Sequence, residues 1–140
     1  MPTACVDTNI WFYALARPAE GEQAKHLGAR ELIGGLEQPI IITPQIINEL
    51  GANLLRKRAW IEPELRTLTS DLLSRCRLFI PGADWHEEAS RLREGHRLSF
   101  WDSLVVVSAQ AAGCETLFSE DMHQGLRLGS LDILNPFAGA

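Results

Sequence analysis

The sequence predicts a three-layer α/β/α sandwich with a mostly parallel central sheet, formed by one domain that spans residues 1–140. Short apolar runs of strand length alternate with longer amphipathic stretches, which is the pattern of βαβ units. The run 39–42 is a proline followed by three isoleucines, and such β-branched runs are typical of parallel strands buried on both faces. A chain of 140 residues is long enough for one sizeable core.

The first elements alternate between strand and helix. An apolar strand is expected at 4–6, and a helix at 10–16 follows it with large apolar residues available for packing. A second helix is expected at 22–36, and it leads directly to the strand at 39–42. This order begins a doubly wound sheet.

The middle of the chain adds two helices and a strand. Thr43 and Pro44 mark a helix start, because threonine caps helices and proline fits their first position, and this helix ends at Arg58. A further helix is expected at 63–75, and a strand is expected at 78–80 before a Pro-Gly stop. One face of the Thr43 helix is apolar and consists of Ile46, Ile47, Leu50 and Leu54.

The last third contains the most informative stretch. A helix is expected at 84–97, and Ser99 is the cap of the next helix, which Gly113 ends in the left-handed conformation. Short apolar strands are expected at 116–118 and 131–134.

Composition and charge limit the class of protein. The net charge of −5 argues against a broadly basic surface for nucleic acids, but clustered carboxylates of a metal site also make a small domain acidic. Cys5, Cys76 and Cys114 are odd in number and form no CxxC, which indicates a reducing compartment without disulfides or a zinc site. The start has no basic segment typical of signal peptides, and no uncharged run reaches membrane-spanning length. We therefore expect a cytoplasmic protein without membrane contact.

Four acids are candidates for one metal site: Asp7, Glu49, Asp102 and Asp121. Asp7 and Asp121 follow short strands, Asp102 opens a helix, and Glu49 lies beside the apolar face of a helix. If the strands 4–6 and 116–118 are neighbours, all four converge at the carboxyl edge of the sheet, where open α/β sheets build their sites. Clustered carboxylates repel one another unless a cation neutralises them, and Mg²⁺ or Mn²⁺ prefers such oxygen ligands.

Each acid also has a purely structural interpretation. Asp102 has the spacing of a capping-box partner of Ser99, Asp7 can cap the following helix, and Asp121 can form a turn. Glu49 can be a solvated residue on a helix flank, as most glutamates are. The tryptophans at 60, 85 and 101 are expected to pack rather than to stack on bases.

Four stretches of the chain together carry a family pattern, although none is decisive alone. They read VDTNIWFYAL, PQIINEL, LSFWDSLVVVSAQAAGCETLFSEDM and LDILNPF. In this order and spacing they resemble the PIN-domain family, specifically the VapC-type toxin ribonucleases of bacteria. The metal-binding acids of that family fall on the positions held here by Asp7, Glu49, Asp102 and Asp121, and its accompanying polar positions on Asn9 and Ser119.

The resemblance implies a Mg²⁺- or Mn²⁺-dependent endoribonuclease that leaves 5′-phosphate and 3′-hydroxyl ends. It also implies a homodimer, an RNA substrate and a cognate antitoxin that lies over the acidic cleft. The physical reading agrees, because no residue pattern supplies a protein nucleophile. Arg56, Lys57 and Arg58, or the arginines of the helix at 84–97, are candidates to contact the RNA backbone.

Three alternatives use the same or a similar α/β fold: two forms of aspartate-based phosphoryl transfer and one binding module without catalysis. An aspartate-based phosphatase would also place an acid after the first strand, but the second acid two positions later is replaced by Asn9. A phospho-receiver needs a lysine after a late strand, and the only lysines are Lys25 and Lys57. A catalytically silent module that binds RNA or protein would keep the fold without needing all four acids.

Overall fold

The computed structural model describes residues 3–122 and 125–137, which form a mixed sheet flanked by helices. Within them, the strands are β1 (Ala4–Val6), β2 (Ile41–Ile42), β3 (Arg77–Leu78), β4 (Thr116–Phe118), β5 (Arg127–Leu128) and β6 (Leu131–Leu134). The helices are α1 (Thr8–Leu15), α2 (Gln23–Gly35), α3 (Pro44–Lys57), α4 (Glu62–Arg75), α5 (Trp85–Gly95) and α6 (Phe100–Ala111). None of these helices combines the length and the apolar character needed to cross a membrane.

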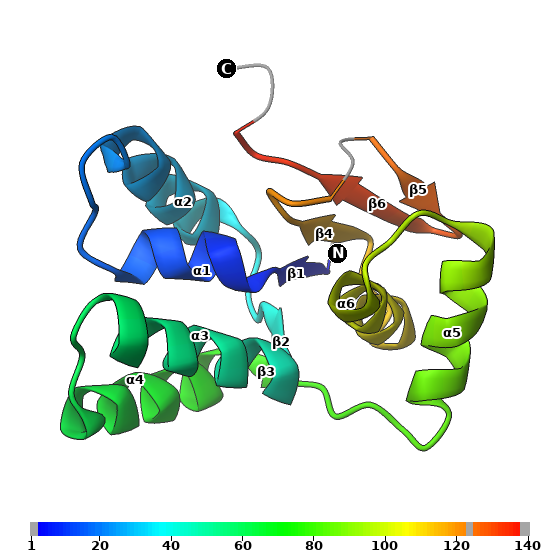
Figure 1. Cartoon of the computed structure of the whole chain (residues 1–140), viewed down its shortest axis with the longest axis horizontal. Helices are drawn as coiled ribbons and strands as arrows, with labels where there is room; N and C mark the ends of the chain where they lie inside the picture. The colour runs from blue at the N-terminus through cyan, green and yellow to red at the C-terminus, as the bar shows by residue number, and fades with distance from the viewer. Residues whose placement is uncertain (1–2, 123–124, 138–140) are drawn as a thin grey trace.

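The sheet has the strand order β3-β2-β1-β4-β6-β5, and every neighbouring pair is parallel except β5 with β6. In the view of Figure 1, α1 to α4 lie to the left of the sheet, and α5 and α6 lie to its right. The predicted α/β/α sandwich with a mostly parallel sheet is therefore confirmed. Strand order reverses between β1 and β4, and ligands of open α/β sheets bind at such reversals.

The core lies between the sheet and the helices that cover it. Residues 40–42 are at most 1% exposed, as the β-branched run predicts for a strand covered on both faces. Ile10 of α1, Leu50 of α3 and Val106 of α6 are fully buried and supply the helical layers of the same core. These contacts hold the amino ends of α1, α3 and α6 close to the sheet.

Local sequence signals account for the ends of these helices. The Thr43 hydroxyl accepts a hydrogen bond from the Ile46 N–H (3.3 Å), so it caps α3 as predicted. Gly113 follows α6 with φ +80°, the left-handed conformation predicted for it. Helix α1 begins at Thr8, two residues earlier than expected, because Asp7 caps it through the Thr8 N–H (2.8 Å).

The expected strand at 78–80 is shorter and more exposed than its sequence suggests. Strand β3 pairs only over Arg77–Leu78, and Leu78 and Ile80 are 40% and 67% exposed. Among the strands of the described residues, β3 is at the edge of the sheet and pairs with β2 alone, so apolar residues there are not covered on both faces.

Strand β5 was absent from the sequence-based prediction. It joins β6 through Gly129 and Ser130, and Gly129 has φ +63°. A two-residue connection with glycine first is a hairpin signal, and it is visible in the sequence between Leu128 and Leu131. The resulting pair is antiparallel because so short a connection cannot form a crossover.

The cap of α3 generates a stability prediction. Thr43→Ala removes the side-chain acceptor for the Ile46 N–H and should lower the free energy of unfolding by about 1 kcal/mol. Thr43→Ser keeps that acceptor and is the matched control. Denaturant unfolding of the three proteins measures the difference, and equal losses in both variants would show that the buried methyl group, not the cap, stabilises α3.

Candidate active site

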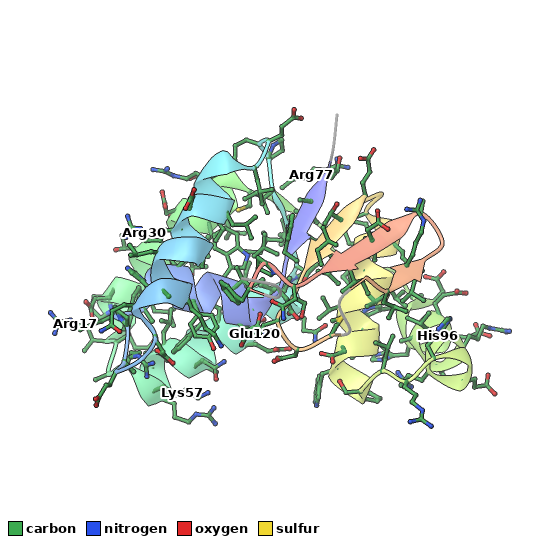
Figure 2. The ribbon with its side chains drawn as sticks, turned by 90° about the horizontal axis from the view of Figure 1, so that it is seen from above. Arg17, Arg30, Lys57, Arg77, His96 and Glu120 are labelled. Atoms are coloured by element: carbon green, nitrogen blue, oxygen red, sulfur yellow. The ribbon has the colours of Figure 1, made fainter. Side chains whose placement is uncertain are left out.

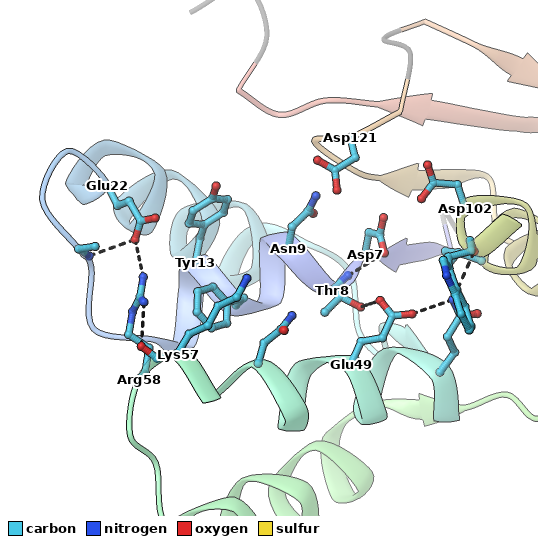
Figure 3. Close-up of a pocket in the computed structure, with 16 residues that line it drawn as sticks. Asp7, Thr8, Asn9, Tyr13, Glu22, Glu49, Lys57, Arg58, Asp102 and Asp121 are labelled. Carbon is cyan, nitrogen blue, oxygen red and sulfur yellow. Dashed lines mark hydrogen bonds and ion pairs between the residues drawn. The ribbon is translucent and has the colours of Figure 1, made fainter. Parts of the chain in front are cut away.

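A pocket of about 540 Å³ opens at the carboxyl edge of the sheet, where the strand order reverses. Its wall includes all four predicted acids, which come from four separate segments of the chain (Figure 3). The other lining residues are Thr8, Asn9, Phe12, Tyr13, Ala19, Glu22, Gln45, Asn53, Lys57, Arg58, Trp101 and Val105. The condition for the convergence of the four acids, that the strands 4–6 and 116–118 are neighbours, is met because β1 pairs directly with β4.

Asp7 is the most firmly held of the four acids. It follows β1 and is 6% exposed. Its Oδ1 accepts from the Thr8 N–H (2.8 Å), and its Oδ2 accepts from the Ser119 hydroxyl (2.8 Å). The backbone N–H of Asp7 also donates to the Phe118 carbonyl (2.9 Å), so the end of β4 fixes its position. Asp7 therefore caps α1 and lines the pocket at the same time.

Glu49 projects from the second turn of α3 into the pocket (Figure 3). Its Oε1 accepts from the Gln45 side-chain amide (2.8 Å), and its Oε2 accepts from the Thr8 hydroxyl (3.4 Å). Two donors thus orient a carboxylate that the sequence alone allows to be a solvated surface group.

Asp102 lies in the first turn of α6 and is half-buried in the pocket wall. Its backbone N–H donates to the Ser99 hydroxyl (3.0 Å), so Ser99 caps the helix as predicted. The cap uses the backbone of Asp102, and its side chain is left to line the pocket.

The two acids after β4 have different surroundings. Asp121 lines the pocket and is exposed. Glu120 is not part of the pocket wall and instead pairs with the Lys25 ammonium (2.5 Å) and accepts from the Tyr13 hydroxyl (3.0 Å). The side chain of Glu120 lies against α1 and α2 (Figure 2), so this pair ties the segment that carries Asp121 to the helices.

The pKa values of two acids reflect their burial and their proximity. The pKa of Asp7 is raised to about 6, chiefly by burial and also by the carboxylates of Asp102 and Glu49, while the hydrogen bonds from Ser119 and Thr8 lower it in part. Burial also raises the pKa of Asp102, with added repulsion from Asp121 and Glu49 and an opposing contribution from Ser99. The four acids therefore act on one another electrostatically across a single pocket.

The donor set of the pocket fits a hard divalent cation. Its acidic ligands are all carboxylate oxygens, the type that Mg²⁺ and Mn²⁺ prefer. Asn9, which also lines the pocket, has both carboxamide polar atoms buried without a hydrogen-bond partner among residues 3–122 and 125–137. In that same part of the chain, no three His, Cys, Asp or Glu side chains lie close enough to hold one ion as they stand. The carboxylates share a wall rather than forming a closed cage.

Several pocket residues were given no role in the site from the sequence, among them Thr8, Gln45 and Trp101. Thr8 and Gln45 donate to Glu49, and Gln45 precedes it by one helical turn, a spacing that the sequence displays. Trp101 was expected to pack rather than to stack on bases. It packs edge-on against Phe100 (5.3 Å between ring centroids), but it lines the pocket and is 63% exposed. It directly precedes Asp102 on the first turn of α6, and a helix places successive residues on different sides.

The cations predicted to contact RNA divide into two groups. Lys57 and Arg58 line the pocket, whereas Arg56 does not. On α5, Arg91 pairs with Glu87 (2.9 Å) and Arg93 donates to the Ser103 hydroxyl (2.7 Å), away from the pocket. The positive charge in the site therefore comes from the end of α3.

The fold and the site define the class of protein: an α/β domain with a carboxylate-lined pocket at the reversal of strand order. The chain belongs to the PIN domain family, whose sequence profile matches residues 4–125. The resemblance seen in the sequence motifs is confirmed by this match. No curated protein matches the sequence.

Solved structures with this fold include toxins and toxin–antitoxin complexes. Mycobacterium tuberculosis VapC20, described as a toxin that cleaves the sarcin-ricin loop, is 20% identical with a TM-score of 0.66 over 85% of this chain and 92% of its own. A chain of a toxin–antitoxin complex from Klebsiella pneumoniae is 16% identical with a TM-score of 0.72 over 96% and 98%. A chain of DNA-bound VapBC from Salmonella typhimurium is 14% identical with a TM-score of 0.65 over 95% and 97%. At these identities the likeness establishes the fold.

The raised pKa of Asp7 generates a stability prediction. Because its pKa in the folded protein, about 6, lies above the ordinary value of 3.8, the charged form destabilises the fold at pH 7, and this cost disappears as the pH falls towards 4. In metal-free buffer with EDTA, Asp7→Asn should therefore be more stable than wild type at pH 7, by up to about 2–3 kcal/mol. The advantage should vanish near pH 4.

Chemical denaturation at both pH values measures this difference. Asp84→Asn, at an exposed position outside the pocket, is the control and should change stability little at either pH. A less stable Asp7→Asn at pH 7 would show that the hydrogen bonds to the carboxylate outweigh its desolvation and repulsion.

Proposed function

We propose that this protein is a Mg²⁺- or Mn²⁺-dependent endoribonuclease and the toxin of a toxin–antitoxin pair. The observation that carries the proposal is the meeting of four carboxylates from separate segments in one pocket, with raised pKa values at Asp7 and Asp102. Raised pKa values at clustered carboxylates are the signature of a site whose charge a cation balances.

Asp7, Glu49, Asp102 and Asp121 would hold the cation. When bound, it polarises a phosphoryl oxygen and lowers the pKa of an attacking water. Ser119 and Thr8 orient Asp7, while Gln45 and Thr8 orient Glu49, so two carboxylates are fixed before an ion arrives. Ser119 donates a hydrogen bond to Asp7, but it is fully buried and does not line the pocket, so its hydroxyl is not placed to attack a bound strand.

The toxin role rests on likeness to other proteins. VapC20 is described as a cleaving toxin, and the Klebsiella and Salmonella matches come from toxin–antitoxin complexes. We extend these roles to this chain: an RNA substrate, a cognate antitoxin that covers the acidic pocket, a homodimer and a cytoplasmic location. A basic side chain of the antitoxin would neutralise the carboxylates in place of the cation.

RNA cleavage by the purified protein tests the enzymatic part. The protein, freed of any partner, is incubated with total RNA with and without Mg²⁺ or Mn²⁺, and the cut ends are mapped. Asp102→Asn and Asp121→Asn should each reduce cleavage strongly, by tenfold or more if the lost carboxylate contributes at least about 1.4 kcal/mol to the transition state.

Glu120→Gln is the matched control for Asp121→Asn, because the two acids are adjacent and only Asp121 lines the pocket. It should keep most activity, since glutamine retains a hydrogen bond to Tyr13. If Glu120→Gln lost more cleavage activity than Asp121→Asn, Glu120 and not Asp121 would be the acid of the metal site. Metal-independent cleavage, or none by the wild-type protein, would favour a silent binding module.

Growth of the expressing cells tests the toxin role. Expression of the wild-type protein alone should slow growth, and co-expression of the adjacent small gene product should restore it. Asp102→Asn, expressed to the same level, should leave growth normal because it removes a carboxylate of the pocket. Normal growth with abundant, nuclease-active wild-type protein would contradict the toxin role and leave the nuclease intact.

A further inference from the structure

The pocket has two ends of opposite charge. The carboxylates of the candidate metal site lie at the sheet. Lys57 and Arg58 lie at the carboxyl end of α3, where Glu22 also lines the pocket and pairs with Arg58, so this end carries one positive charge beyond its ion pair. Figure 3 shows Glu49 and Lys57 projecting from the same helix along the pocket. They are separated by about two helical turns, which corresponds to about 12 Å along the axis of α3. If a polyanion binds to a divalent cation held by the carboxylates, another part of the same polyanion lies near the positive charge at the carboxyl end of α3.

Lys57 is the cation of this end whose charge is not balanced. The part of the chain that the structure describes contains no ion-pair partner for Lys57, which is exposed in the pocket wall. Arg58 differs, because its Nη2 pairs with Glu22 (2.9 Å) and its Nε donates to the Arg17 carbonyl (3.1 Å). Its guanidinium is committed to holding the α1–α2 connection, while the Lys57 ammonium keeps its three donors.

Two neighbours shape the space around this ammonium. The Lys57 Nζ lies 5.9 Å from the centroid of the Phe12 ring, a cation–π contact that holds the side chain over α1. Asn53 lies one helical turn earlier and also lines the pocket. Its Oδ1 accepts from Arg56 (3.0 Å), which leaves its NH₂ group to donate. The neighbourhood therefore offers donors and a positive charge to an anionic group.

The charge of Lys57 also complements the dipole of α3, as any cation in a last turn does. That effect does not depend on which side of the helix carries the cation, and Arg56 supplies it equally from outside the pocket. The helix dipole therefore explains why a cation lies in the last turn of α3, but it does not explain why Lys57 lies in the pocket wall.

We propose that Lys57 forms a phosphate subsite for the bound strand, separate from the phosphate that lies at the carboxylates. The proposal rests on the RNA substrate proposed above. At about 3.4 Å of axis per phosphate in a stacked strand, the span along α3 places this second phosphate about three nucleotides from the first. Lys57 is thereby a binding and positioning residue, which acts on the strand and not on the reacting atoms.

Binding of short single-stranded RNA in EDTA tests the subsite without cleavage. Fluorescence anisotropy at several salt concentrations yields the slope of log K against log salt, which is about 0.7 per phosphate contact for single strands. Lys57→Gln should reduce the magnitude of this slope by about 0.7. Lys57→Arg should retain the slope because it keeps the charge.

Arg30→Gln is the matched control, since it removes one positive charge from an exposed position on α2 that lies outside the pocket (Figure 2). It should leave the slope unchanged. A second arm replaces one phosphate at a time by a neutral methylphosphonate. At one position of the strand, this replacement should weaken binding to the wild-type protein and leave binding to Lys57→Gln unchanged.

Equal slopes for wild type, Lys57→Gln and Arg30→Gln would overturn the subsite, as would methylphosphonate effects that are the same in both proteins. Undetectable binding by the wild-type protein at low salt would overturn it too. A Lys57-dependent slope without any cleavage in Mg²⁺ or Mn²⁺ would support the subsite and reject the nuclease. Metal-dependent cleavage with a slope that does not depend on Lys57 would support the nuclease and reject the subsite.

Discussion

The parallel pairing of β1 with β4 is the constraint on which the site depends. It joins the Asp7 N–H to the Phe118 carbonyl and brings Ser119 within hydrogen-bond distance of Asp7, although the two residues are 112 positions apart. These strands have three residues each, so their pairing persists because the helices on both faces bury them. The acidic pocket is therefore a product of the whole core.

Helix capping and pocket lining coincide at two acids. Asp7 caps α1 and lines the pocket, and Asp102 supplies its backbone to a cap while its side chain reaches the pocket. This coincidence has a physical cause. Helices of an α/β sheet begin near the carboxyl ends of strands, so residues that favour helix starts lie at the edge where sites form. Alternative interpretations of one acid need not exclude each other.

Helix α3 divides the charge of the pocket. Its capped amino end presents Glu49 beside the sheet, and its last turn presents Lys57 at the far end. An overall charge of −5 conceals this arrangement, because net charge reports neither the gathering of carboxylates nor an uncompensated cation beside them. For a protein proposed to bind a polyanion, the distribution of charge along the pocket is the informative quantity.

The sequence by itself determined the alternation of strands and helices, the buried run 40–42, the caps at Thr43 and Ser99, and the set of four acids, because these depend on periodicity and local chemistry. It overestimated the strand at 78–80 and missed the hairpin of β5, since exposure at a sheet edge and pairing of two-residue strands depend on neighbours. The pocket wall contains Asp121, as the sequence predicted, but only the tertiary structure decided that the adjacent Glu120 pairs with Lys25. It also decided that Trp101 is exposed and that Lys57 lacks the counter-ion that Arg58 has within the described residues. These outcomes depend on contacts between segments distant in the chain, which no local pattern encodes.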